Sequence, residues 1–117
     1  MSYPIFSDEY FMNEALKEAQ KAMDLEEVPV GAVVVNQNRI IARAHNMTQQ
    51  LNDVTAHAEM IALTAASGFL GSKYVNECIL YVTLEPCIMC AAALKRAQMG
   101  KLIYGASDPR EGFTQLG

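Results

Sequence analysis

Two short motifs constrain this chain more than any other feature of its sequence. His57-Ala58-Glu59 is answered, thirty positions after His57, by Cys87 in Pro86-Cys87-Ile88-Met89-Cys90. One imidazole and two thiols spaced i,i+3 can hold a metal ion through three protein ligands, which leaves Glu59 as a spare carboxylate. Any fold of this chain must therefore bring the two motifs to one point. A zinc site whose fourth position is left to water is of the catalytic kind.

Size and composition fit one globular domain over residues 1–117, because 51% of the residues are hydrophobic and 19% are charged. No apolar run approaches the roughly 20 residues of a membrane span, and the N-terminus has no secretory signal. We therefore expect a cytoplasmic protein without a membrane partner. With three cysteines, a Cys-x-x-Cys in this context indicates metal binding or redox chemistry. The net charge of −4 is a weak basis for gripping nucleic-acid phosphates.

Hydrophobic periodicity predicts the order α-β-β-α-β-α-β, and hence an α/β fold that is a three-layer α-β-α sandwich with a mixed sheet. The last two strands are joined through a helix, so they should be parallel. The stretch 107–117 has neither pattern, and we expect nothing to cover the fourth strand. The predicted elements are a helix over 7–25, strands over 30–35 and 39–45 with a hairpin turn at 37–38, a helix over 56–67 that stops near Gly68, a strand over 79–83, a helix from Pro86 to about 98, and a strand over 101–106.

The first helix is predicted to be amphipathic, with Ser7 as its N-cap and one face laid on the sheet. The apolar positions of this helix are Phe11, Ala15, Ala19, Ala22 and Met23, with Glu14, Lys17, Glu18 and Lys21 between them. We interpret the methionines at positions 12, 23, 60, 89 and 99 as core residues.

Each half of the metal motif is predicted to open a helix. The partial positive charge of a helix N-terminus lowers the pKa of a thiol placed there, which favours Cys87 and Cys90 as thiolates. No further Cys or His stands in a suitable place: Cys78 opens a strand and is expected to be an apolar filler, and His45 is expected to be structural or near the rim. Zinc held this way would lower the pKa of a bound water toward about 7.

Each part of the motif has a simpler interpretation. A Cys-x-x-Cys often holds structural zinc, although that needs two more ligands where the chain offers one. A redox pair usually occurs in a different βαβ context. His57 as a core histidine and Glu59 as a solvated helix residue are the remaining alternatives. The joint occurrence of the histidine, the glutamate and the two cysteines at this spacing favours the open zinc site over these alternatives.

The surrounding residues resemble the bacterial tRNA adenosine deaminases of the cytidine-deaminase superfamily, whose H-x-E…P-C-x-x-C signature binds zinc. The resemblance rests on residues 55–60 (Thr-Ala-His-Ala-Glu-Met) and 83–91 (Thr-Leu-Glu-Pro-Cys-Ile-Met-Cys-Ala). Residues 28–33 and 104–108 are similar to that family too, and the likeness spans nearly all of 7–113. Thr-Leu-Glu before Pro-Cys, with Gly-Ala-x-Asp after the last strand, favours the tRNA enzymes over the free-base deaminases.

This resemblance implies a cytidine deaminase-like fold, here without the family's last strand and C-terminal helix because the sequence stops at Gly117. It implies one Zn²⁺ per subunit, held by His57, Cys87 and Cys90 with a water as fourth ligand. Glu59 would be the catalytic residue that moves protons while adenosine at the tRNA wobble position becomes inosine. A homodimer that binds the tRNA anticodon stem-loop is implied as well. Substrate contacts are implied for Pro29, Val30, Asn46, Ala58, Leu84, Glu85, Pro86 and Asp108.

Two other functions stay open. A deaminase of a free base or nucleoside, such as guanine or cytosine, would suit the acidic net charge and the missing basic tail. A zinc-stabilised interaction module without catalysis is the third possibility, although a chain that has both Glu59 and Asn46 argues against it. Without the resemblance, Asn46 is a loop residue and Asp108 a turn former ahead of Pro109.

Overall fold

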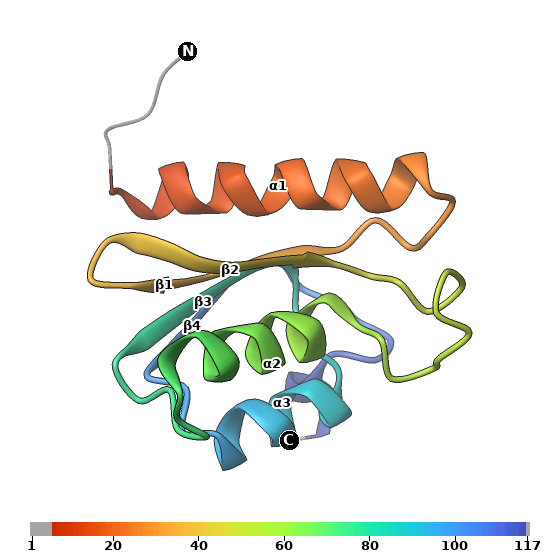
Figure 1. Cartoon of the computed structure of the whole chain (residues 1–117). Helices are drawn as coiled ribbons and strands as arrows, with labels where there is room; N and C mark the ends of the chain where they lie inside the picture. Colours follow the sequence, from red (N-terminus) through yellow and green to blue (C-terminus); the bar gives the residue numbers. More distant parts are fainter. Residues whose placement is uncertain (1–5, 117) are drawn as a thin grey trace.

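A computed structural model describes residues 6–116, without the side chains of 115 and 116, so residues 1–5 and 117 of the predicted domain lie outside the described residues. One sheet in the order β2-β1-β3-β4 separates α1 on one face from α2 and α3 on the other (Figure 1). This arrangement confirms the predicted three-layer fold. The elements are α1 (Asp8–Asp24), β1 (Gly31–Asn36), β2 (Arg39–His45), α2 (Ala58–Leu70), β3 (Cys78–Leu84), α3 (Ile88–Arg96), β4 (Lys101–Ala106) and the 3-10 helix η1 (Phe113–Leu116).

The sheet is mixed, as predicted. Strand β1 pairs antiparallel with both β2 and β3, and β3 pairs parallel with β4. Strands β2, β3 and β4 therefore run in one direction and end at the same edge of the sheet. The segments that follow these three strands leave from that edge, and two of them lead into α2 and α3. The carboxyl ends of like-directed strands are where α/β proteins place their binding sites.

The hairpin between β1 and β2 turns where the sequence predicts it. Gln37 and Asn38 both have positive φ, 52° and 63°, and the flanking Asn36 pairs with Arg39. Two-residue turns of this kind match the twist of the strands they join, and asparagine tolerates the left-handed conformation well. The hairpin thus sets the register of β2, whose last residue leads into the loop of the site.

Helix α1 begins as predicted and packs on the sheet. The side chain of Ser7 accepts a hydrogen bond from the backbone N–H of Tyr10 at 3.1 Å. Phe11 is buried against Tyr81 of β3, with ring centroids 5.3 Å apart. Met23, however, is 54% exposed, so its placement in the core was wrong. It lies in the last turn of α1.

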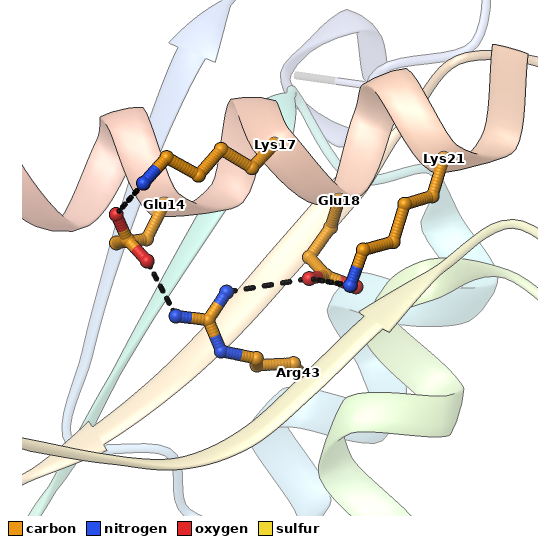
Figure 2. A network of polar contacts seen from close by, with 5 residues as sticks. All are labelled: Glu14, Lys17, Glu18, Lys21 and Arg43. Atoms are coloured by element: carbon orange, nitrogen blue, oxygen red, sulfur yellow. Dashed lines mark hydrogen bonds and ion pairs between the residues drawn. The ribbon is translucent and has the colours of Figure 1, made fainter.

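The sheet-facing side of α1 also contains two glutamates that the sequence placed between its apolar positions. Glu14 and Glu18 are only 7% and 3% exposed. Arg43 of β2 bridges both carboxylates, and its Nη1 lies 3.3 Å from Glu18 (Figure 2). Lys17 and Lys21 complete the network at 2.7 Å and 2.9 Å. The helical period puts positions 14 and 18 on the same side of the helix as the apolar residues 11, 15, 19 and 22. The charge of a glutamate does not by itself show that its position faces the sheet.

The two helices on the other face end at different residues from those predicted. Helix α2 continues through Gly68 to Leu70 and is closed by Gly71, whose φ of 66° is the left-handed conformation that glycine adopts without cost. Helix α3 begins after Cys87 as N-cap, so Pro86 precedes the helix instead of lying in its first turn. It ends at Arg96, because Gln98 takes a positive φ and Met99 N–H returns to the carbonyl of Leu94.

The segment after β4 is more ordered than its sequence predicts. Gly112 forms a bridge with Cys87, and η1 follows from Phe113. The ring of Phe113 meets that of Tyr104 on β4 edge-on, with centroids 6.2 Å apart. Part of β4 is therefore covered, contrary to expectation. Within residues 6–116, no helix is long and apolar enough to cross a membrane.

Candidate metal centre and pocket

The topology brings the two metal motifs to the same edge of the sheet. His57 is the N-cap of α2 and Cys87 is the N-cap of α3, both with extended backbone. Cys90 lies one turn into α3, so its sulfur returns to the start of that helix. The prediction that the two motifs meet at paired helix starts is confirmed.

The three predicted ligands form a metal-sized group. Nδ1 of His57 lies 3.6 Å from Sγ of Cys87 and 3.5 Å from Sγ of Cys90. Tetrahedral zinc with ordinary Zn–N and Zn–S bonds separates nitrogen from sulfur by about 3.6 Å. The donor atoms therefore fit zinc as they stand. Among the described residues, these three form the one such group, so the site has an open fourth position.

Cys90 differs from its prediction in acidity. Burial raises the pKa of the Cys90 thiol, and the nearby negative charges of Glu59 and Cys87 act in the same direction. For the metal-free chain, the expectation that the helix start would lower the pKa of this thiol is wrong, since burial disfavours the charged thiolate. A bound cation is what would hold Cys90 as a thiolate.

Glu59 lies in the first turn of α2 beside the ligands and is 4% exposed. It is not among the ligand group. Burial raises the pKa of its carboxyl, although its own backbone N–H, the charge of His57 and a hydrogen bond with Cys90 oppose the shift. A carboxyl whose pKa is raised by burial is suited to accept and return a proton.

A cavity of about 210 Å³ lies against this centre. Five of the eight predicted substrate residues line it, namely Val30, Asn46, Leu84, Glu85 and Asp108. Pro29, Ala58 and Pro86 adjoin lining residues in the chain without lining the cavity. The complete lining comprises Val28, Val30, Asn46, Thr48, His57, Glu59, Leu84, Glu85, Cys87, Asp108 and Glu111.

Asn46 is held in a defined orientation. Its Oδ1 accepts a hydrogen bond from the backbone N–H of buried Ala58 at 2.8 Å. Its own backbone N–H donates to the carbonyl of Val30 at 3.1 Å. Among the described residues nothing accepts from Nδ2, so this amide nitrogen is the end available to a ligand in the cavity. His45 next to it contacts the carbonyl of Asn46 through Nδ1 at 3.1 Å and is not a ligand.

One wall of the cavity, at Val28 and Thr48, was not anticipated by sequence reasoning. The buried carboxylate of Glu27 accepts from Thr48 Oγ1 at 3.2 Å and from the N–H groups of Gln49 and Gln50 at 3.0 Å and 2.7 Å. Burial disfavours the charged carboxylate, but these hydrogen bonds outweigh it and lower the pKa of Glu27. In the sequence, an acidic residue, Glu27, directly before Val28 is the signal that could have indicated this anchored wall.

The opposite wall, at Asp108 and Glu111, belongs to the segment after β4. The side chain of Asp108 accepts from the N–H groups of Arg110 and Glu111 at 3.0 Å and 3.2 Å. The simpler interpretation of Asp108 as a turn former therefore holds, and the residue lines the cavity as well. Hydrogen bonds from Thr114 lower the pKa of the neighbouring Glu85. Glu111 was missed because its position depends on this turn.

Comparison with known proteins defines the class of this metal centre. Residues 6–106 match the family of the cytidine and deoxycytidylate deaminase zinc-binding region. The chain therefore belongs to this family of zinc-binding deaminases. The family assignment and the donor geometry agree that the centre holds one zinc ion.

Within the family, the chain groups with the tRNA-specific adenosine deaminases. It is 50% identical over 104 residues to the enzyme of Aquifex aeolicus, which covers 89% of this chain and 69% of that protein. It is 50% identical over 108 residues to the enzyme of Agrobacterium fabrum, which covers 92% of this chain and 71% of that protein. A solved tRNA:A34 deaminase, studied for A-to-I editing at the wobble position, superposes with a TM-score of 0.89 at 50% identity over 93% of this chain and 79% of that one.

A second deaminase activity occurs on the same fold. The guanine deaminase of Bacillus subtilis superposes with a TM-score of 0.83 at 36% identity, over 86% of this chain and 65% of that one. Its lower identity makes guanine the less favoured substrate class.

Proposed function

We propose that this protein is a zinc-dependent hydrolase that converts adenosine to inosine at the wobble position of a tRNA and releases ammonia. The relatives named tRNA-specific adenosine deaminase, at 50% identity over most of the chain, support this substrate. One observation carries the chemistry: the three-ligand metal centre and the non-ligating Glu59 border the same cavity as Asn46. Metal, proton carrier and base contact are thus within reach of one bound nucleoside.

His57, Cys87 and Cys90 would hold the zinc ion. Bound zinc supplies a water activated for attack at neutral pH. His57 and Cys87 line the cavity, which brings a ligand in the cavity next to the metal centre. Because Nδ1 of His57 faces the two sulfurs, the ring would carry its proton on Nε2.

Glu59 is proposed to move the protons. It takes one from the attacking water, passes it to a nitrogen of the adenine ring, and takes the second to the departing amine. The water oxygen first bonds to C6 while the ring nitrogen takes up the first proton. The second proton, from the oxygen now on C6, then goes to the amine, so that the bond between C6 and the amine breaks, a carbonyl forms at C6 and ammonia leaves. The low exposure of Glu59, 4%, limits the access of bulk water to these protons.

The adenine ring would lie between the apolar side chains of Val30 and Leu84, with Nδ2 of Asn46 donating to a ring nitrogen. Asp108 would face the flanking nucleotides from the segment after β4, and the backbone at Glu85 would form part of the cavity wall. Pro29, Ala58 and Pro86 are proposed to support the substrate through the residues beside them that line the cavity. These contacts would select a flipped-out nucleoside.

We further propose that the enzyme acts in the cytoplasm as a homodimer on the anticodon stem-loop, in one domain over residues 1–117. The names of the relatives support the tRNA partner. The dimer and the location rest on the family resemblance of residues 55–60 and 83–91.

The test is ammonia and inosine release by the zinc-loaded protein from an anticodon stem-loop with adenosine at the wobble position. Free adenine, guanine and cytosine are assayed in parallel, and Glu59→Ala serves as the blank. Release from the stem-loop that Glu59→Ala abolishes is the expected result. Release from guanine alone would replace the tRNA by the substrate class of the Bacillus subtilis relative.

A further inference from the structure

The carboxylate of Glu85 is engaged by the segment after β4 on both of its oxygens. Glu85 is 2% exposed and stands two residues before Cys87. Its Oε1 accepts from the backbone N–H of Asp108 at 3.0 Å. Its Oε2 accepts from the N–H and the hydroxyl of Thr114 at 2.8 Å and 2.6 Å. A buried carboxylate needs such donors, and here all three come from the two ends of one short segment.

The segment between these two ends is pressed onto Glu85. A Cβ on Gly112 would stand 2.3 Å from Cδ of Glu85, closer than real atoms approach. The N–H of Phe113 donates to the carbonyl of Pro86 at 2.9 Å, and Gly112 bridges Cys87. A side chain at position 112 would have to push the Glu85 carboxylate away from its three donors.

The segment is also a wall of the cavity, through Asp108 and Glu111. Its remaining hydrogen bonds are largely internal, from Arg110 and Glu111 to the Asp108 side chain and from Gly112 to the Asp108 carbonyl. Glu85 is the side chain that ties this segment to the rest of the molecule at both of its ends. Its carboxylate therefore holds both ends of the wall, beside the backbone contacts of Gly112 and Phe113 with Cys87 and Pro86.

We propose that Glu85 is a positioning residue: its carboxylate fixes residues 108–114 as one wall of the substrate cavity and does not itself contact substrate. The substrate part of this inference rests on the proposed function, whereas the anchoring part does not. With the wall released, we expect the metal centre to keep its three ligands, because the hydrogen bonds of this carboxylate go to Asp108 and Thr114 and to none of the ligands. Substrate binding weakens while the chemical step is preserved.

The experiment compares Glu85→Gln with wild type in the zinc-loaded full chain. Glutamine keeps the shape but offers one acceptor oxygen and places an NH₂ against an N–H donor. Thr114→Val is the milder variant, since it removes only the hydroxyl donor. Glu77→Gln, an exposed glutamate before β3, is the matched control. Three readouts are taken: amide hydrogen exchange at Asp108 and Thr114, zinc per chain, and kcat and KM on the wobble stem-loop.

In Glu85→Gln we expect exchange at Asp108 and Thr114 about tenfold faster or more, KM raised about tenfold, kcat within about threefold, and an unchanged zinc content. Thr114→Val should move exchange and KM in the same direction by less, and Glu77→Gln should match wild type. Unchanged exchange in Glu85→Gln would overturn the anchoring role. Lost zinc, or a fall in kcat without a rise in KM, would overturn positioning in favour of a role at the metal centre or in the reaction.

The two proposals fail separately. If wild type is inactive on the stem-loop, the proposed substrate is wrong, but the exchange rates at Asp108 and Thr114 still test the anchor. If wild type acts on guanine, the same KM and kcat comparison is made with guanine. A Glu85→Gln chain that fails to fold leaves the decision to Thr114→Val, whose unchanged exchange at Thr114 would contradict the anchor.

Discussion

Asn46 links the substrate side of the cavity to the start of α2. His57 is the N-cap of that helix but makes no side-chain cap hydrogen bond. The Oδ1 of Asn46 takes this place by accepting from Ala58 N–H at 2.8 Å. One amide thereby satisfies a helix N-terminus through its oxygen and faces the cavity with its nitrogen.

Asn46→Ala should therefore cost stability as well as substrate affinity. The substitution leaves a buried N–H at Ala58 without a partner, which should lower the free energy of unfolding by about 1–2 kcal/mol. Urea unfolding at a fixed zinc concentration measures the change. Asn76→Ala, at an exposed position, is the control and should lie within about 0.5 kcal/mol of wild type. Equal stability of both variants would show that Asn46 does not cap α2.

At the scale of single elements, two glycines near the end of α2 have opposite roles. Gly68 lies inside the helix with open space around its missing Cβ, whereas Gly71 closes the helix at a φ of 66°. A side chain is favourable at the first position and strained at the second. The sequence pattern alone assigns the stop to the wrong glycine.

Gly68→Ala should raise stability by about 0.5–1 kcal/mol, and Gly71→Ala should lower it by about 1 kcal/mol. For a domain of this size, the two melting temperatures should differ by several degrees in opposite directions from wild type. Thermal unfolding followed by circular dichroism makes the comparison, with each variant serving as the control for the other. Equal shifts would mean that the helix ends at Gly68 in solution.

Helix α1 is attached to the sheet by charge as well as by apolar packing. Hydrogen bonds from Lys17 and Arg43, with the attraction of both cations, lower the pKa of the Glu14 carboxyl despite its burial. A carboxyl whose pKa is lower in the folded state stabilises the fold above its unfolded pKa, near 4.5. That contribution is lost as the pH falls through the lower folded value.

Arg43→Met should reduce this acid sensitivity, with Lys17 still paired to Glu14. At pH 7 the variant should lose about 1–3 kcal/mol, less than a fully buried ion pair because Arg43 is partly solvent-exposed. Below about pH 4.5 the difference from wild type should shrink, since the Glu14 carboxyl is then protonated, first in the unfolded chain and at lower pH in the folded chain. Urea midpoints between about pH 3 and pH 7 test the trend against Arg39→Met, an exposed arginine. A constant difference across that range would contradict the assignment.

At the scale of the whole molecule, the metal centre joins two separate parts of the chain. His57 stands directly before α2. Cys87 and Cys90 lie at the start of α3, which follows β3 in the chain. An ion held by all three has no preformed site in the unfolded chain. The free energy of metal binding therefore adds to the free energy of unfolding.

Removal of zinc by a chelator should lower the melting temperature. At a free zinc concentration of a hundred times Kd, binding contributes about 2.7 kcal/mol, which corresponds to a shift on the order of 10 °C. Melting curves with and without chelator measure the loss. Cys90→Ala should show little dependence on chelator, because its site retains two ligands. The same large shift in Cys90→Ala would place the stabilising ion elsewhere.

The sequence by itself determined the metal ligands, the spare Glu59, the hairpin turn and the order of helices and strands along the chain. These features depend on residue type and short-range spacing: i,i+3 thiols share a helix face, and asparagine permits the turn at Asn38. Such features can be predicted from a sequence because they depend on residues that are close together along the chain.

Only the tertiary structure decided which groups meet across elements. Glu14 and Glu18 of α1 are buried because Arg43 of β2 pairs with both carboxylates. The pKa of the Cys90 thiol is higher than its place near a helix start predicts, because burial removes the thiol from water. The cavity wall at Asp108 exists because Glu85 and Gly112 fit against each other. Such contacts join residues far apart in the chain, and desolvation depends on everything packed around a group, so no local pattern encodes them.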